Sequence, residues 1–332
     1  MVLAVSGSSQ RMMQSLILDA QTLLYGRARQ ILKLSPLPAG HIGEALDIID
    51  PVSMVESYTI WGGIPRYWEL AAPFKEKIKK AVIALVLDPM GVLHDEPRRL
   101  LLEEMPSAIS LRPLLDVMGM GTHRLSEMAA RVGQPVTSLT RPLLRLQELG
   151  LVVREIPFGE SEKPSKRVLY KIADPFFRFW FCVVAAQRSP LVDAGETLYQ
   201  TLLKQALPGL YAQAWEELCR HVIPKLGDPS WMPSKRFWHG KGPEWDVVSQ
   251  SVDKQKLLLG EAKWSRSTLS TAFIEKTAQH LMEKGSPPLK NKKYRSIDYI
   301  IFVPRKPCQK AQLPANVRLV DAAEVMNILK DA

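Results

Sequence analysis

Polar and apolar residues alternate over residues 242–264, and this alternation predicts two β-strands joined by a tight turn. Successive side chains of a strand point to opposite faces, so Glu244 and Asp246 share one face of the first strand. Glu261 and Lys263 share one face of the second strand in the same way. Four charged side chains are therefore expected close together at one end of an otherwise apolar hairpin.

The register of this hairpin decides which charges meet. A two-residue turn at 253–254 places Asp246 directly across from Glu261, and Glu244 across from Lys263. Two carboxylates and an ammonium at cross-strand distance suit a divalent cation that faces a phosphate. A surface patch of salt bridges on an edge hairpin is the alternative, and the hairpin alone does not decide between the two.

A second pattern lies in the middle of the chain. Apolar residues at helical spacing predict a helix over 122–133, ended by a glycine, and a second helix over 138–150. Two strands around a polar, basic loop follow over 151–174. This order is that of a winged helix-turn-helix. Pro142 lacks the amide hydrogen that a mid-helix position needs, so the second helix is expected to begin near Thr140.

Basic residues in this segment make DNA the expected partner. Arg141 and Arg145 face outward from the second helix, where a recognition helix meets the major groove. Lys163, Lys166 and Arg167 lie in the loop between the two strands, where a wing contacts phosphates. A solvated basic face is the alternative, because many winged helices mediate only protein contacts.

Helices and strands alternate in the last third of the chain. A helix over 209–223 precedes the charged hairpin, and a helix over 270–284, a strand over 298–304, a short strand near 316–321 and a last helix follow it. The alternation predicts an α/β domain. The aromatic segment 175–188 is expected to pack domains together rather than to stack on bases.

Composition limits the class of binding partner and the cellular compartment that are expected for this chain. The chain has 332 residues, a formal net charge of +10 and a pI near 9.4, which favours a polyanion, nucleic acid before membrane. Cys182, Cys219 and Cys308 are too widely spaced for a zinc site or a disulfide framework. No apolar run reaches the roughly 18 residues of a membrane helix, and no signal peptide is recognised, so a cytoplasmic protein is expected.

The last domain and its charged motif resemble the PD-(D/E)xK nuclease superfamily. A helix, two antiparallel strands that carry D…ExK, a helix and a strand follow one another in that order, and Asp246, Glu261 and Lys263 match the motif. The acidic residue that such nucleases carry in the first helix is Glu216 or Glu217. Glu216 is preferred, because Glu217 points away from the buried face of that helix.

This resemblance implies a restriction-endonuclease-like site with Mg²⁺ or Mn²⁺ as its ion. Asp246 and Glu261 would hold the ion together with the backbone carbonyl of Ala262, and Glu216 would assist. Lys263 would stabilise the charge that develops on the phosphate oxygens.

Six motifs along the chain carry a second, wider resemblance. They are LYGR at 24–27, WGGIPRYW at 61–68, LHDEPRRLLLEE at 93–104, YKIADPFFRFWF at 170–181, EWDVV at 244–248 and LGEAKW at 259–264. In this combination and order they resemble the prokaryotic, largely archaeal AAA or STAND-type ATPases, often called DEXX-box ATPases, that carry a C-terminal domain of unknown function. The resemblance implies an ATPase module, a winged helix and a nuclease-like tail.

One part of that family pattern is missing. The sequence contains no GxxxxGK[ST] phosphate loop, and VLAVSGSS at 2–9 resembles the late sensor strand of such ATPases, which the lid follows. We therefore expect no nucleotide site, and no binding or hydrolysis of ATP by this chain alone. Without that loop, Arg27 is expected to be a surface or packing arginine. The start is expected to be truncated, either a misassigned start or a true remnant.

The expected fold is multidomain, α and α/β. Residues 1–73 would be the lid remnant of an ATPase module, 74–190 a helical segment with the winged helix-turn-helix, and 195–332 the nuclease-like domain. The expected function is that of a DNA-binding protein with a metal-dependent nuclease-like domain. Two alternatives stay open: a non-catalytic regulatory or interaction module on an inactive nuclease fold, and the C-terminal part of an ATP-binding ATPase. A homo-oligomer and a separate ATPase partner are both compatible with the sequence.

Overall fold

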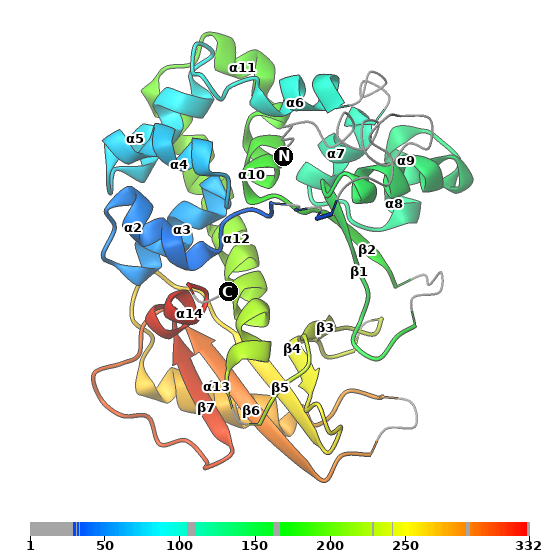
Figure 1. Ribbon diagram of the computed structural model, residues 1–332, viewed down its shortest axis with the longest axis vertical. Helices are drawn as coiled ribbons and strands as arrows, with labels where there is room; N and C mark the ends of the chain where they lie inside the picture. The colour runs from blue at the N-terminus through cyan, green and yellow to red at the C-terminus, as the bar shows by residue number, and fades with distance from the viewer. Residues whose placement is uncertain are drawn as a thin grey trace.

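The fold is mixed α/β, with helices in the first two thirds of the chain and a five-stranded sheet in the last third (Figure 1). The computed structural model describes residues 29–30, 32, 34–104, 111–161, 167–227, 229–240, 242–289 and 293–330. The predictions for Arg27, Lys163, Lys166 and the segment 2–9 lie outside these residues. None of the helices described combines the length and the apolar character needed to cross a membrane.

Among the described residues, six α-helices form the first part. They are α2 (Ile42–Leu46), α3 (Pro51–Trp61), α4 (Pro65–Ala71), α5 (Ile78–Val82), α6 (Glu96–Glu104) and α7 (Arg112–Gly119). Asp50 begins α3 by accepting a hydrogen bond from the Ser53 amide, with proline at the first helical position. Gly62, at φ 59°, ends α3 in a conformation that suits glycine, so the Gly-Gly-x-Pro turn separates α3 from α4.

Two helices and a hairpin follow, in the order expected from the sequence. They are α8 (Leu125–Val132), α9 (Val136–Glu148), β1 (Val152–Glu155) and β2 (Leu169–Ile172), with β1 and β2 antiparallel. The predicted start of the second helix is wrong, because α9 begins at Val136 and contains Pro142. Leu139, Leu143 and Leu146 are buried on one face of α9, and this packing outweighs the backbone hydrogen bond that proline removes.

Helix α10 (Pro175–Val183) forms the centre of the helical part. Its aromatic side chains are buried, which confirms the prediction of a packing role. Helix α11 (Arg188–Val192) follows, and α12 (Glu196–Val222) then runs from the helical part to the sheet (Figure 1). Helix α12 extends further towards the N-terminus than the predicted helix, because Pro208 is accommodated within it.

The sheet has the strand order β3-β4-β5-β6-β7. Its strands are β3 (Lys235–Phe237), β4 (Trp245–Gln250), β5 (Lys256–Ala262), β6 (Ser296–Val303) and β7 (Val317–Asp321), accompanied by the helices α13 (Thr271–Glu283) and α14 (Ala322–Ile328). Strand β4 is antiparallel to both of its neighbours, β3 and β5, whereas β5, β6 and β7 are parallel. The central strands are buried on both faces, as their burial patterns show.

Alternating residues of the sheet pack into two cores. Leu258 and Phe302 belong to the core that α12 shares with the helical part, whereas Leu259 and Ile301 belong to the core under α13. The charged hairpin of the sequence analysis is β4–β5. Its end at Asp246 and Glu261 therefore lies between two apolar layers.

The predicted register of β4–β5 is confirmed, since Val247 pairs with Gly260 and Val248 with Leu259. The predicted two-residue turn is wrong. The Ser251 amide donates to the Lys256 carbonyl, so the loop spans residues 252–255. The wider loop has the same register because it adds one residue on each side of the turn.

Candidate active site

The candidate site lies where β4 begins and β5 ends, against the second half of α12. The register of β3 on β4 shifts by one residue here, between the pairs Lys235 with Val248 and Phe237 with Trp245. Such irregularities redirect side chains and end regular pairing. One consequence is that Glu244 lies before β4 and bonds to Arg236, instead of pairing with Lys263 as predicted.

Asp246 is the half-buried carboxylate at the centre of the site. One of its oxygens accepts a hydrogen bond from the Ala262 amide at 3.0 Å. Burial, together with the negative charges of Glu216 and Glu261, raises the pKa of Asp246 from 3.8 to about 6. No Lys or Arg in the described chain forms an ion pair with it. Asp246 is therefore a carboxylate whose negative charge is only partly compensated.

Glu261 lies beside Asp246 and has two cationic partners. Its two oxygens contact the Lys263 Nζ at 2.7 Å and the Lys284 Nζ at 2.9 Å. Burial acts to raise the pKa of Glu261, but the hydrogen bonds from the two lysines outweigh burial and lower it. Burial lowers the pKa of Lys263, yet Glu261, Asp246 and Glu216 together raise it. The negative charges of all three predicted carboxylates thus stabilise the Lys263 ammonium.

Glu216 faces the site from α12. Its carboxylate lies 3.6 Å from an Arg220 nitrogen and 3.8 Å from the Arg236 Nε. Arg220 also donates to the Asp246 carbonyl at 3.1 Å, so it belongs to the site rather than pointing away from it. Glu217 instead pairs with Arg178 of α10 at 2.9 Å. The structure thus brings together Asp246, Glu261, Lys263 and Glu216.

Besides Arg220, three further charged residues around the site were not found from the sequence. Lys284 follows the end of α13, Arg236 lies on the edge strand β3, and Glu155 ends strand β1 of the preceding hairpin. Arg236 lies on the strand directly before β4, whereas Lys284 and Glu155 come from elements further away along the chain. No spacing pattern in the sequence relates them to the D…ExK motif, so only the tertiary packing could reveal them.

The oxygen atoms of the candidate site fit a divalent cation. Hard oxygen atoms are available from Asp246, Glu261 and the Ala262 carbonyl, and Mg²⁺ commonly takes one or two carboxylates and keeps several waters. The partly compensated carboxylate of Asp246 fits such an ion. Across the described residues, no three side chains of His, Cys, Asp or Glu are grouped so as to hold a metal ion. The protein ligands would therefore be two carboxylates and a carbonyl, and waters or a phosphate would complete the shell.

The predicted DNA-binding residues lie apart from these carboxylates. Arg141 is exposed on α9, whereas Arg145 is half-buried and contacts Glu148 at 3.1 Å. Arg167, just before β2, contacts Glu160 at 2.9 Å. Arg141 therefore has the surface exposure that a DNA contact needs, and the other two would exchange an acidic partner for phosphate.

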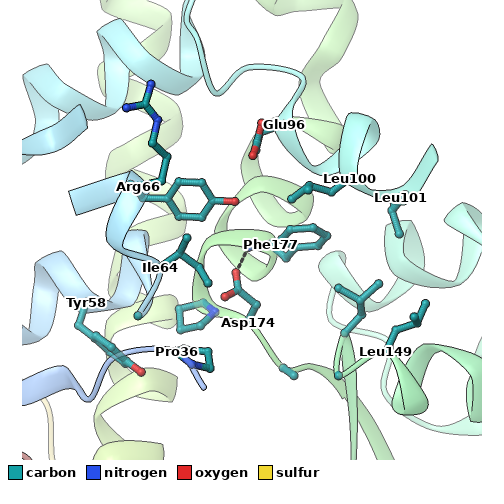
Figure 2. Close-up of a pocket in the computed structure, with 16 residues that line it drawn as sticks. Pro36, Tyr58, Ile64, Arg66, Glu96, Leu100, Leu101, Leu149, Asp174 and Phe177 are labelled. Carbon is teal, nitrogen blue, oxygen red and sulfur yellow. Dashed lines mark hydrogen bonds between the residues drawn. The ribbon is translucent and has the colours of Figure 1, made fainter. Parts of the chain in front are cut away.

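A separate apolar pocket of about 560 Å³ lies in the helical part (Figure 2). It is lined by residues of α3, α4, α6 and α10 and by the half-buried carboxylate of Asp174. The Asp174 carboxylate accepts a hydrogen bond from the Phe177 amide at 2.8 Å and so begins α10. None of the four candidate catalytic residues lines this pocket, and Asp174 has a structural role there.

Comparisons with known proteins name no activity. The uncharacterized protein MJECL04 of Methanocaldococcus jannaschii is 27% identical over 289 residues, which are 85% of this chain. The chain spans 64% of the length of that relative. No solved structure matches. Residues 180–278, which contain Glu216, Asp246, Glu261 and Lys263, match DUF234, a family described as "Archaea bacterial proteins of unknown function".

Proposed function

We propose that the chain binds DNA and hydrolyses phosphodiester bonds with a divalent cation held by Asp246 and Glu261. The observation that carries the proposal is the state of Asp246, a half-buried carboxylate without an ion-pair partner beside Glu261 and Lys263. Buried charges are costly unless a partner compensates them. A divalent cation supplies the missing charge and also gives the neighbouring lysine a phosphate to act on.

The residues would divide the chemistry among them. Asp246, Glu261 and the Ala262 carbonyl would hold Mg²⁺ or Mn²⁺, whose chemistry when bound is to acidify a water and neutralise phosphate charge. Lys263 would turn from Glu261 to the phosphate oxygens and stabilise the charge that develops there. Glu216 would orient the bound water from α12. Burial between two apolar cores strengthens each of these interactions.

DNA would be held by the preceding segment. Helices α8 and α9 and the hairpin β1–β2 have the order of a winged helix-turn-helix, and Arg141 is exposed on the second helix. The net charge of +10 supports a polyanionic partner. The resemblance to the ATPase family adds a role beside an ATPase module, which a longer protein would contain.

The test is cleavage of a supercoiled plasmid and of a short labelled duplex with Mg²⁺ or Mn²⁺, against EDTA. Metal-dependent cleavage that Asp246→Asn and Glu261→Gln each abolish supports the proposal. Asp298→Asn is the matched control, because Asp298 pairs with Lys256 at the other end of β5. Cleavage that survives Asp246→Asn, or the absence of cleavage despite metal binding, would contradict the catalytic proposal.

A non-catalytic scaffold is the second candidate, and one observation favours it. Glu261 and Glu216 already have cationic partners in this structure, namely Lys263 and Lys284 for the first and Arg220 and Arg236 for the second. A site whose carboxylates are internally compensated can be stable without an ion. DNA binding that does not depend on metal, together with no cleavage, would support this candidate.

A further inference from the structure

Hairpin β1–β2 is attached to the sheet next to the candidate site. Beyond β1, the Phe158 amide donates to the Arg236 carbonyl at 2.8 Å, and the Phe158 ring is buried in the core under α13. Figure 1 shows the hairpin reaching from the helical part down to β3. The segment proposed to bind DNA and the edge strand of the sheet are thus in direct contact.

One side chain at this contact touches both parts. The Arg236 guanidinium lies 3.8 Å from Glu155 of the hairpin, 3.8 Å from Glu216 of the site and 3.3 Å from Glu244. Its side chain is only 19% exposed and stacks over Trp238. Glu155 is itself held by a buried Lys171 at 2.7 Å. Arg236 is therefore confined among three carboxylates that belong to three different segments.

We propose that Arg236 is a positioning residue that couples the hairpin to the candidate metal site. Its guanidinium, shared between Glu155 and Glu216, opposes the entry of a divalent cation, and Glu155 draws the guanidinium away from the site. Movement of the hairpin then changes the affinity for the ion. This inference rests on the proposed function, since it concerns the regulation of the same site.

The charges give two variants with opposite expected effects. Arg236→Gln removes a positive charge beside Glu216, so the Kd for Mn²⁺ should fall by roughly tenfold. Glu155→Gln removes the carboxylate that draws Arg236 away, so the Kd should rise by about threefold. In the double variant the effect of Glu155→Gln should disappear, because Glu155 acts through Arg236. A merely structural role predicts instead that both single changes weaken binding.

The experiment is a titration with Mn²⁺ alone, followed by electron paramagnetic resonance of the free ion. Lys235→Gln is the matched control, because it removes the same charge from the neighbouring, exposed position of β3 and should leave the Kd unchanged. A higher or unchanged Kd in Arg236→Gln would overturn the inference. Loss of Mn²⁺ binding in Asp246→Asn is expected if the site is correct. No binding by the unaltered chain would overturn the proposed function and this inference together.

A second measurement needs no variant. Coupling is reciprocal, so Mn²⁺ that releases Arg236 from Glu216 should strengthen its contact with Glu155. The amide of Phe158, which reports attachment of the hairpin, should then exchange its hydrogen several-fold more slowly with Mn²⁺ present. Unchanged or faster exchange at saturating Mn²⁺ would contradict the coupling even where the metal site is intact.

Discussion

Two hairpins of this protein each hold a half-buried carboxylate, and the pKa of the carboxylate is shifted in opposite directions in the two. In β1–β2, burial acts to raise the pKa of Glu155, but Lys171 and two arginines lower it below its ordinary value. In β4–β5, burial, Glu216 and Glu261 raise the pKa of Asp246 to about 6. The first carboxylate is fully paired and needs nothing further. The second lacks a cation, and this difference identifies β4–β5 as the place where a ligand is expected.

The hairpins also differ in what surrounds them. Strands β1 and β2 form a two-stranded sheet that is only half-buried, although Lys171 of β2 is itself buried. Strand β5 is covered on both faces. Burying a charge in such a strand costs free energy unless a partner compensates the charge. A charge on a solvent-exposed hairpin has little such cost.

Lys263→Met should have the largest effect. Cleavage should fall at least about 100-fold, because a single charge-stabilising donor is worth that much in comparable sites. Mn²⁺ binding should be retained, since the lysine acts on phosphate and not on the ion. Measurement of cleavage rate and Mn²⁺ affinity on the same sample separates the two. Lys256→Met, at the opposite end of β5, should leave both unchanged, and loss of metal binding in Lys263→Met would show that the role assigned to Lys263 is wrong.

Gly260→Ala tests the packing that brings the carboxylates together. An added Cβ would lie 2.6 Å from the Ile300 Cγ2 and 2.9 Å from the Val247 Cβ, in the centre of the sheet. We expect a loss of roughly 1–3 kcal/mol in the free energy of unfolding, measured with urea. Gly209→Ala, on an exposed turn of α12 where nothing lies within 4 Å of the new Cβ, should instead stabilise slightly. Equal effects of the two changes would contradict this packing.

Asp246→Asn should change how stability depends on pH in the absence of metal. The pKa of Asp246 lies at about 6 in the folded chain and at 3.8 as its ordinary value. The folded state therefore holds a proton that the unfolded state releases, and the stability due to Asp246 is present below the unfolded pKa and lost as the pH rises through the folded pKa. The melting temperature of the asparagine variant relative to the parent should rise from pH 4 to pH 7. A pH-independent difference would contradict the raised pKa.

Much of this site could be predicted from the sequence, because its core motif is local. The alternation in β4–β5 defined the register, and helical spacing along α12 distinguished Glu216 from Glu217. Arg236 and Lys284 could not be predicted in this way, since they reach the site from an edge strand and a helix end. Pro142 shows the same limit in the fold, because its local preference against a mid-helix position was overridden by the buried leucines of α9.

Substitutions of the exposed and half-buried arginines of α9 and the β1–β2 hairpin should have the smallest effects. Arg141 is exposed on α9, so its loss should weaken duplex DNA binding by about 1 kcal/mol if it reaches a base edge. Arg145→Ala should cost less, because Arg145 must first leave Glu148. Arg167→Ala should mainly make DNA binding less dependent on salt. The slope of the logarithm of the binding constant against the logarithm of the salt concentration should fall by about one unit. Fluorescence anisotropy over a series of salt concentrations measures all three effects, with Arg66→Ala on α4 as the control. An unchanged DNA affinity in the Arg141 and Arg145 double variant would show that this surface does not bind DNA.

The central claim is that the imbalance of charge around Asp246 is made for a divalent cation. Anomalous diffraction from crystals soaked in Mn²⁺ tests it most directly. A peak is expected between the carboxylates of Asp246 and Glu261, at roughly 2.0–2.6 Å from their oxygen atoms, the distance that oxygen ligands keep from such ions. No such peak is expected in crystals of the Asp246→Asn variant. Density that stays empty between the two carboxylates at saturating Mn²⁺, with Glu261 still bound to Lys263 and Lys284, would contradict it.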